Sequence, residues 1–260
     1  MKRFLPAQIF LLLLPVLASA AVKTEPVEYR QGDTVLQGWL AYDDAVKGPR
    51  AGVLLVHDWL GATEHQKAQV EKLAALGYVA LAADIYGKGV RPANAQAASA
   101  EAGKYYKDPA LMRARVRAGL DFLASRPQAD ASRLAVTGYC FGGRCALELA
   151  RSGAPLRAVV TFHGSLATAT PEDAKNIKAS VLALHGADDP FVKPEEVKGF
   201  MDEMRAANVD WQLVQYSGAV HSFTDPRAGN DNSKGGAYNA TADRRSWQAM
   251  KDFLAERLAK

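Results

Sequence analysis

The sequence predicts an α/β fold, with a mostly parallel central sheet, helices on both faces and a β-hairpin at the N-terminus. Short runs that are apolar at every position, such as Ala51 to Val56, alternate with amphipathic stretches. Fully apolar runs are typical of strands buried on both faces, and their alternation with helices is typical of parallel sheets. Before them, residues 27–40 alternate in polarity around the turn Gln31-Gly32-Asp33, as a hairpin does.

The boundaries of the other elements follow from apolar periodicity and from glycine and proline. Gly77 ends the first helical stretch, and Asp108-Pro109 divides residues 93–126 into two helices, with Pro109 near the first turn of the second. After the hairpin, the expected strands are 51–56, 78–83, 134–137, 156–162, 180–184 and 211–216. The expected helices are 64–76, the two within 93–126, then 142–150, 194–206 and 242–258. In such a sheet the ligand site lies at the carboxyl ends of the strands.

The composition indicates one domain behind a leader. The chain has 260 residues, 48% of them hydrophobic, which suits a single large domain over residues 21–260. Residues 1–20 have the pattern of a signal peptide: the basic start Met1-Lys2-Arg3, a short apolar stretch over 9–17, and small residues up to Ala20. We expect cleavage after Ala20, a secreted and periplasmic protein, and no membrane contact after cleavage. A retained N-terminal anchor is the alternative.

The charge of the chain gives no sign of a nucleic-acid partner. Removing Lys2 and Arg3 leaves 30 basic and 28 acidic residues, and no long basic run occurs.

The run Gly138-Tyr139-Cys140-Phe141-Gly142 is a candidate nucleophile site. It follows a strand-like stretch and precedes a helix-like one, so Cys140 falls on a sharp strand-to-helix turn of the form G-x-C-x-G. The glycines allow strand and helix to approach closely, and the start of the helix favours a thiolate. A buried cysteine in a glycine-rich turn is the alternative interpretation.

The second cysteine, Cys145, is expected to be a free thiol packed in the core. Five residues along a helix correspond to about 7.5 Å of rise and about 140° of rotation, which does not suit a disulfide with Cys140. A redox role for the pair is the alternative.

An acid and a histidine follow later strands in the order that nucleophilic hydrolases of this topology use. Asp188 and Asp189 come after the strand that ends near Gly186, and His221 comes after the last strand. We predict that Cys140 attacks an acyl carbon, that His221 moves the proton, and that Asp189 orients the imidazole. Asp188 is interpreted as a turn former.

An oxyanion formed at Cys140 needs backbone donors. The N–H of Phe141 follows the nucleophile, and the N–H of Trp59 lies on the loop after an early strand, so we predict that these two form the oxyanion hole.

These motifs resemble the dienelactone hydrolase family of α/β hydrolases, also called carboxymethylenebutenolidases. The resemblance runs from about Val27 to Phe253 and is most specific around Cys140, around the Gly186–Val192 turn and at His221-Ser222-Phe223. It implies an α/β-hydrolase fold, a Cys-Asp-His triad and hydrolysis of a lactone or ester without a cofactor. It also implies that an acidic residue, here Asp58, hydrogen-bonds the resting thiol.

The chain departs from the family pattern at positions that contact substrate. Asp58 stands where well-studied members have glutamate. Lys88, after Tyr86, stands where they have an arginine, and Asp225 lies near the position of a second arginine. We expect weak substrate contacts from Lys88, Tyr86 and Asp225. An unpaired Asp225 would repel carboxylates, which predicts a preference for neutral esters or lactones.

The expected partner is therefore a small-molecule ester or lactone, with no cofactor and no metal, in a monomer or small homo-oligomer. A non-catalytic ligand-binding protein on a hydrolase scaffold and a thiol-redox protein are the alternatives.

Overall fold

The computed structural model describes residues 22–259, and the expected leader lies outside these residues. The strands are β1 (Val22–Gln31), β2 (Thr34–Asp43), β3 (Arg50–Val56), β4 (Val79–Ala83), β5 (Ala129–Tyr139), β6 (Ala158–Phe162), β7 (Ser180–Gly186) and β8 (Trp211–Tyr216). The helices are α1 (Glu64–Ala75), α2 (Ala95–Lys107), α3 (Pro109–Ala124), α4 (Phe141–Arg151), α5 (Pro194–Ala206) and α6 (Ala240–Arg257). No helix among the described residues is both long and apolar enough to cross a membrane.

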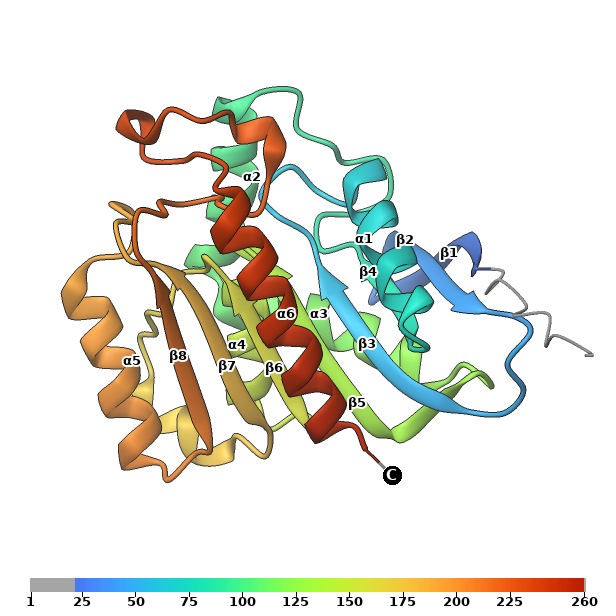
Figure 1. Cartoon of the computed structure of the whole chain (residues 1–260). Coiled ribbons are helices and arrows are strands. Elements are labelled where there is room, and N and C mark those ends of the chain that lie inside the picture. Colours follow the sequence, from blue (N-terminus) through green and yellow to red (C-terminus); the bar gives the residue numbers. More distant parts are fainter. Residues whose placement is uncertain (1–21, 260) are drawn as a thin grey trace, which may run out of the picture.

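The eight strands form one sheet in the order β1-β2-β4-β3-β5-β6-β7-β8 (Figure 1). The hairpin β1–β2 is antiparallel, β2 joins β4 antiparallel, and every later pair is parallel. Because the strands from β3 to β8 run in one direction, their carboxyl ends and the loops after them meet at one edge of the sheet. The predicted fold class is confirmed, including the N-terminal hairpin.

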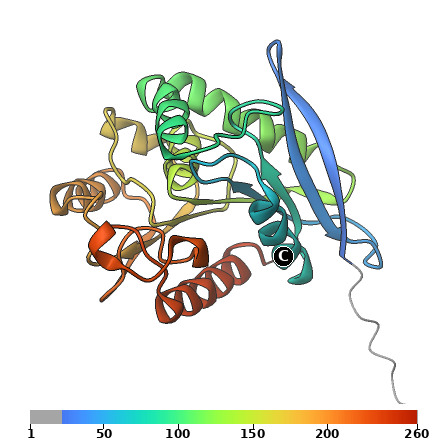
Figure 2. The same ribbon diagram turned by 90° about the horizontal axis from the view of Figure 1, so that it is seen from above.

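Helices cover the sheet on both faces (Figure 2). The side chains of α2, α3, α4 and α5 pack into one apolar cluster, and those of α1 and α6 pack into a second cluster on the opposite face. The central strands are buried along their whole length, as their uninterrupted apolar runs predicted. The sheet is therefore the middle layer of three, and only its edges carry loops that reach a ligand.

Local sequence signals place the helix ends close to where they were expected. Thr63 and Gln66 form a capping box at the start of α1. Asp108 caps α3, with Pro109 at its first position, so the break between α2 and α3 falls at the predicted residues. Two strands begin five residues earlier than expected. β1 begins at Val22 rather than at 27, and β5 begins at Ala129 rather than at 134, because Arg50 and Ala51 of β3 extend the pairing to Ala129 and Asp130.

Helix α4 is fixed to its surroundings by a buried ion network. The guanidinium of Arg151 is fully buried and binds both carboxylate oxygens of Glu203 on α5, at 2.8 and 2.7 Å. It also reaches Glu148 Oε1 at 3.1 Å and the carbonyl oxygen of Leu166 at 3.0 Å. Each buried charge thus has a partner, which is the condition under which buried ion pairs are tolerated. The network restrains α4, the helix that begins directly after Cys140.

Candidate active site

Cys140 lies at the sharp turn between β5 and α4, in a backbone conformation that few side chains adopt. Its φ is 54° and its ψ is −116°, and its N–H donates to the carbonyl oxygen of Phe162 at 3.0 Å. The turn needs glycine on both sides: a Cβ on Gly138 would clash with the backbone of Gly142, and one on Gly142 would clash with the carbonyl oxygen of Val56. The crowding explains the G-x-C-x-G spacing, and the strain at Cys140 is of the kind found at functional sites.

Cys140, His221 and Asp189 lie in a hydrogen-bonded row. His221 Nε2 is 3.0 Å from Cys140 Sγ, and His221 Nδ1 is 2.8 Å from Asp189 Oδ2. The other oxygen of Asp189 accepts the N–H of Phe191 at 2.8 Å, and the Asp189 side chain is fully buried. Asp188 faces away and accepts the N–H of Gly218 at 2.9 Å. The structure therefore brings Asp189, and not Asp188, to the imidazole.

The environment of His221 favours the charged imidazole. Burial disfavours a charged ring, but the Cys140 thiolate and the Asp189 carboxylate outweigh burial and raise the pKa of His221 to about 10. The two ring nitrogens contact different partners, so a proton on Nδ1 is held by Asp189 while a proton on Nε2 faces the sulfur. The row can thus hold a thiolate–imidazolium pair.

The backbone of His221 is fixed by the segment that precedes α6. Its N–H donates to the carbonyl oxygen of Gly235 at 3.1 Å, and its carbonyl oxygen accepts the N–H of Ala237 at 3.0 Å. The ring packs edge-on against Phe191 and against His163, with centroids 5.5 and 5.1 Å away. These two ring contacts and the hydrogen bonds to Asp189 and Cys140 restrict the orientation of the imidazole.

A second histidine, His163, lies beside His221 and is uncharged. Burial lowers the pKa of His163 well below its usual range, and the charge of His221 lowers it further. Its Nε2 is 2.8 Å from Thr224 Oγ1. A neutral His163 ring packs next to His221 without repelling a positive charge on the His221 imidazole.

The two expected oxyanion donors flank Cys140. Phe141 is the first residue of α4, and Trp59 lies on the loop between β3 and α1 that lines the space beside Cys140. Within residues 22–259 neither backbone N–H has a hydrogen-bond partner. Both donors are therefore available to a ligand oxygen.

The loop that carries Trp59 is tied down by three side chains. The hydroxyl of Tyr86 donates to the carbonyl oxygen of Trp59 at 3.0 Å. Asp58 accepts the N–H of Leu60 at 2.7 Å and the side-chain amide of Gln66 at 3.2 Å. These contacts hold the loop in one conformation before any ligand arrives.

Asp58 does not make the expected contact with the thiol. Its carboxylate is occupied by the loop and lies 3.4 Å from Arg227, while Cys140 Sγ has His221 as its partner among the described residues. The physical reason is the short side chain of aspartate, which closes a tight turn onto Leu60, two residues further along the chain. Asp58 still lines the space beside Cys140.

The interpretation of Asp225 as an unpaired carboxylate is wrong. Arg227 binds both of its oxygens, with the shortest contacts at 2.8 and 2.9 Å, and the charge of Arg227 lowers the pKa of Asp225 although burial opposes this. Arg227 was missed in the sequence because only the residues directly after His221 were considered. Its position two residues after Asp225, in a turn that Asp225 caps, is the signal that could have found it.

Lys88 and Tyr86 do not face the space beside Cys140. Lys88 forms a half-exposed ion pair with Glu28 on β1, at 2.6 Å, because its backbone N–H is bound to Val35 on β2 and directs it toward the hairpin. Tyr86 is 5% exposed and packs on Phe141 while its hydroxyl holds Trp59. Neither contacts a ligand in this arrangement.

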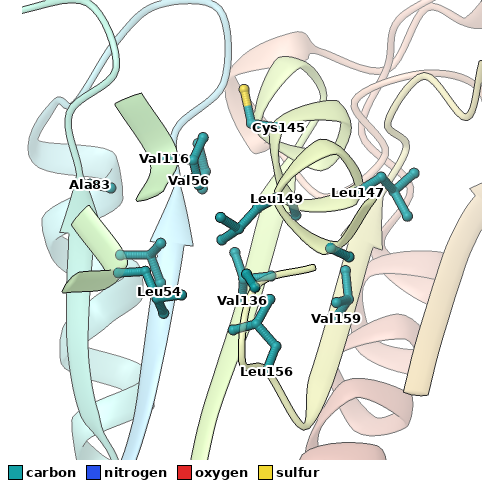
Figure 3. Close-up of a cluster of buried hydrophobic side chains, with 14 of the residues drawn as sticks. Leu54, Val56, Ala83, Val116, Val136, Cys145, Leu147, Leu149, Leu156 and Val159 are labelled. Atoms are coloured by element: carbon teal, nitrogen blue, oxygen red, sulfur yellow. The ribbon is translucent and has the colours of Figure 1, made fainter. Parts of the chain in front are cut away.

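Cys145 is buried among apolar side chains of the cluster that contains Val56 and Leu149 (Figure 3). Both cysteines are free thiols, and burial raises the pKa of the Cys145 thiol well above its usual range. Within residues 22–259 no three His, Cys, Asp or Glu side chains gather as a set of metal ligands.

The fold and the order of these groups define the chain as an α/β hydrolase. The model of the dienelactone hydrolase family matches residues 36–258. The chain belongs to the dienelactone hydrolase family, and it is a hydrolase of the ester and lactone type.

Similar proteins extend over nearly the whole chain. A protein of Salmonella typhimurium with the provisional name carboxymethylenebutenolidase is 32% identical over 239 residues, covering 87% of this chain and 84% of its own. A crystal structure of a dienelactone hydrolase-like promiscuous phosphotriesterase from metagenomic libraries is 44% identical, with a TM-score of 0.87, and the match covers 92% of this chain and all of that one. A dienelactone hydrolase structure from Klebsiella pneumoniae is 26% identical, with a TM-score of 0.77, over 91% of this chain and 99% of that one.

Proposed function

We propose that this hydrolase cleaves carboxylic esters or lactones through a covalent acyl-enzyme, with Cys140 as nucleophile, His221 as proton carrier and Asp189 as the acid that orients it. The observation that carries the proposal is the row of contacts from Sγ to Nε2 at 3.0 Å and from Nδ1 to Oδ2 at 2.8 Å. A nucleophile, a base and an orienting acid within hydrogen-bond reach are what acyl transfer requires.

In the first half of the reaction, the Cys140 thiolate attacks the carbonyl carbon of the substrate and forms a carbon–sulfur bond. The carbonyl oxygen becomes an oxyanion that accepts the N–H groups of Phe141 and Trp59. Each such donor is worth about 3 kcal/mol of transition-state stabilisation. The intermediate then expels the alkoxide, which takes the proton from Nε2 of His221, and a thioester remains on Cys140.

In the second half, water hydrolyses the thioester. His221, now neutral, removes a proton from water as the oxygen attacks the thioester carbon. The carbon–sulfur bond breaks, the carboxylic acid leaves, and the thiolate–imidazolium pair is restored. Asp189 holds the Nδ1 proton throughout and stabilises the imidazolium whenever it forms.

Asp58, Gln66 and Tyr86 act in this scheme as positioning residues. They hold the loop that presents the Trp59 N–H, through contacts to Leu60 and to the carbonyl oxygen of Trp59. An oxyanion hole contributes most when its donors are fixed in advance.

A second candidate reaction is hydrolysis of neutral phosphotriesters. It is favoured by the 44% identity to a promiscuous phosphotriesterase over the full length of that structure. The same thiolate would attack phosphorus and the same two N–H groups would receive the phosphoryl oxygen. Turnover of paraoxon that disappears in Cys140→Ala supports this activity, and absence of turnover in the wild-type protein rejects it.

Export to the periplasm is part of the proposal. It rests on the basic start, the apolar stretch and the small residues of positions 1–20. Mass spectrometry of the protein recovered from a periplasmic extract tests it: a chain that begins at Ala21 supports cleavage, and a chain that keeps Met1 in a membrane fraction contradicts it.

The test of the ester or lactone reaction is a screen of p-nitrophenyl esters and small lactones. Wild-type protein should turn over at least one ester and accumulate a thioester, detectable as a mass increase equal to the acyl group in a rapidly quenched sample. Turnover without that adduct, or equal turnover by Cys140→Ala, would remove Cys140 from the reaction.

A further inference from the structure

A second cavity adjoins the space beside Cys140. The space beside Cys140 itself measures only about 30 Å³, which is little more than a water-sized group. The second cavity measures about 400 Å³ and lies between α1 and α6, beyond the carboxyl ends of β5 and β6. His65, Tyr139 and Thr224 form walls of both. We call the larger one the α1/α6 cavity; it offers room for the part of a substrate that does not fit beside Cys140.

The floor of the α1/α6 cavity is flat, aromatic and hydrogen-bonding. The rings of Tyr139 and Phe162 stack with centroids 4.6 Å apart and an interplanar angle of 13°. Tyr139 is 7% exposed and Gln69 is 9% exposed. Both residues line the cavity, so each places a polar side chain in its wall.

The rim of the cavity carries two cations without partners. Neither Lys72 on α1 nor Arg244 on α6 forms an ion pair within the described part of the chain, and Lys72 lies over the ring of Trp247 at 6.0 Å. Asp243 is the acid in the wall, and its carboxylate accepts the hydroxyl of Tyr238 at 3.1 Å. Burial raises the pKa of Asp243 and lowers that of His65, while the charge of Lys72 lowers both. With Asp243 counted as a carboxylate, Lys72 and Arg244 leave one net positive charge at the rim.

The charge at Cys140 has the opposite sign. Asp58 and Asp225 lie there with Arg227 between them, which leaves one net negative charge next to the reacting carbon. A carboxylate on the substrate is therefore repelled at Cys140 and attracted at the rim of the α1/α6 cavity. The expectation of neutral substrates rested on Asp225 and on Lys88 as the one nearby cation, and both residues belong to the region around Cys140 in the sequence pattern.

We infer that the α1/α6 cavity binds a planar, carboxylate-bearing arm of the ester, with the ring on Tyr139 and Trp247 and the carboxylate at Lys72 and Arg244. The inference rests on the proposed reaction at Cys140 and names its substrate class. The substrates are esters formed at the hydroxyl group of a hydroxylated aromatic carboxylic acid, whose carboxylate remains free. The volume of about 400 Å³ accommodates one such ring.

Binding is tested without catalysis, by NMR titration of the Cys140→Ala protein with 4-hydroxybenzoate and with its neutral counterpart 4-hydroxybenzamide. We expect the carboxylate to bind about tenfold more tightly, since two partly exposed ion pairs contribute a few-fold each. Adding Lys72→Ala and Arg244→Ala should abolish this difference. Arg245→Ala is the matched control, because Arg245 is an exposed cation on the same helix outside the cavity.

Catalysis is tested with the corresponding acetates, 4-acetoxybenzoate and 4-acetoxybenzamide. The ratio of their kcat/KM values should fall about tenfold in the Lys72→Ala/Arg244→Ala protein and stay at the wild-type value in Arg245→Ala. Hydrolysis of both esters without a charge preference, together with equal binding of both products, overturns the inference and leaves the proposed function standing. Preferential binding of the carboxylate without hydrolysis of either ester overturns the proposed function alone.

Discussion

The two cysteines lie close together in sequence, one directly before α4 and one inside it, and have opposite environments. Cys140 precedes the helix in a strained conformation and is partly exposed. Its Sγ lies 3.0 Å from Nε2 of His221, and the Asp189 carboxylate contacts the other nitrogen of that ring. Cys145 lies inside the helix, has no exposed surface, and is packed among apolar residues such as those labelled in Figure 3. The same side chain is thus placed once in hydrogen-bond contact with a histidine and once in an apolar cluster.

This difference shows that the surroundings of a cysteine decide whether its thiol can form a thiolate. A thiolate needs a cation or a helix start nearby, and Cys140 has both His221 and the N-terminus of α4. Burial at Cys145 disfavours the thiolate and raises the pKa of that thiol. The comparison predicts one reactive nucleophile and one packing residue, and each variant below tests a part of that contrast.

The largest effect is expected from Cys140→Ala. The covalent step is lost while the small side chain fits the same turn, so kcat should fall by roughly a thousandfold or more. Cys145→Ala is the matched control and should keep activity near the wild-type value. The check is kcat on a p-nitrophenyl ester for both variants, with circular dichroism to verify folding. A comparable loss in Cys145→Ala would show that the second thiol takes part in the chemistry.

The next largest effect should separate Asp189→Asn from Asp188→Asn. Only Asp189 contacts the imidazole, so its amide would impose the wrong tautomer and lower kcat by about a hundredfold or more. Asp188 closes a turn onto Gly218, and its amide should change kcat less than about threefold. Steady-state kinetics on both variants decides; the reverse order of severity would mean that the orienting acid has been assigned to the wrong residue of the pair.

How much of this could be predicted depends on whether a feature is local in sequence. The elements were predictable because periodicity and caps are local, as at Thr63 and Pro109. The candidate triad was predictable because parallel strands deliver their carboxyl ends to one edge, so residues after β5, β7 and β8 must meet. The choice of Asp189 over Asp188 followed from the resemblance of the Gly186–Val192 segment to the G-x-x-D-x-x-V turn of this fold.

Features that depend on where a flexible side chain finds a partner could not be predicted in the same way. Lys88 turns to Glu28 and Arg227 turns back to Asp225, and neither pairing follows from a periodic pattern. Asp58 bonds to its own loop instead of the thiol because a tight turn offers it a closer N–H. The α1/α6 cavity lies between two helices that are about 170 residues apart in the sequence. No sequence pattern indicates that Lys72 and Arg244 lie on the rim of the same cavity.

The charge coupling between Cys140 and His221 predicts a shift in a titration curve. The Cys140 thiolate is the first contributor that raises the pKa of His221, to about 10. The imidazolium is therefore present below pH 10 and is lost as the pH rises through 10, and kcat/KM should fall over the same range because the leaving oxygen loses its acid. In Cys140→Ala the His221 pKa should drop by more than one unit, which corresponds to more than about 1.4 kcal/mol. NMR titration of the ring measures this; an unchanged curve in Cys140→Ala would show that no thiolate acts on the histidine.

The smallest effects concern stability, and here the two cysteines should be sensitive to different properties of the replacing residue. Cys145→Ala removes a buried sulfur from a packed cluster and should lower the free energy of unfolding by about 1–2 kcal/mol. At Cys140 the backbone has φ of 54°, which glycine adopts without strain, so Cys140→Gly should be more stable than Cys140→Ala by about 1 kcal/mol. Urea unfolding of the wild-type protein and the three variants, with equal m values as the condition for comparison, measures both differences. If Cys140→Gly is no more stable than Cys140→Ala, the turn stores no strain at Cys140, and the contrast between the two cysteines reduces to burial and charge.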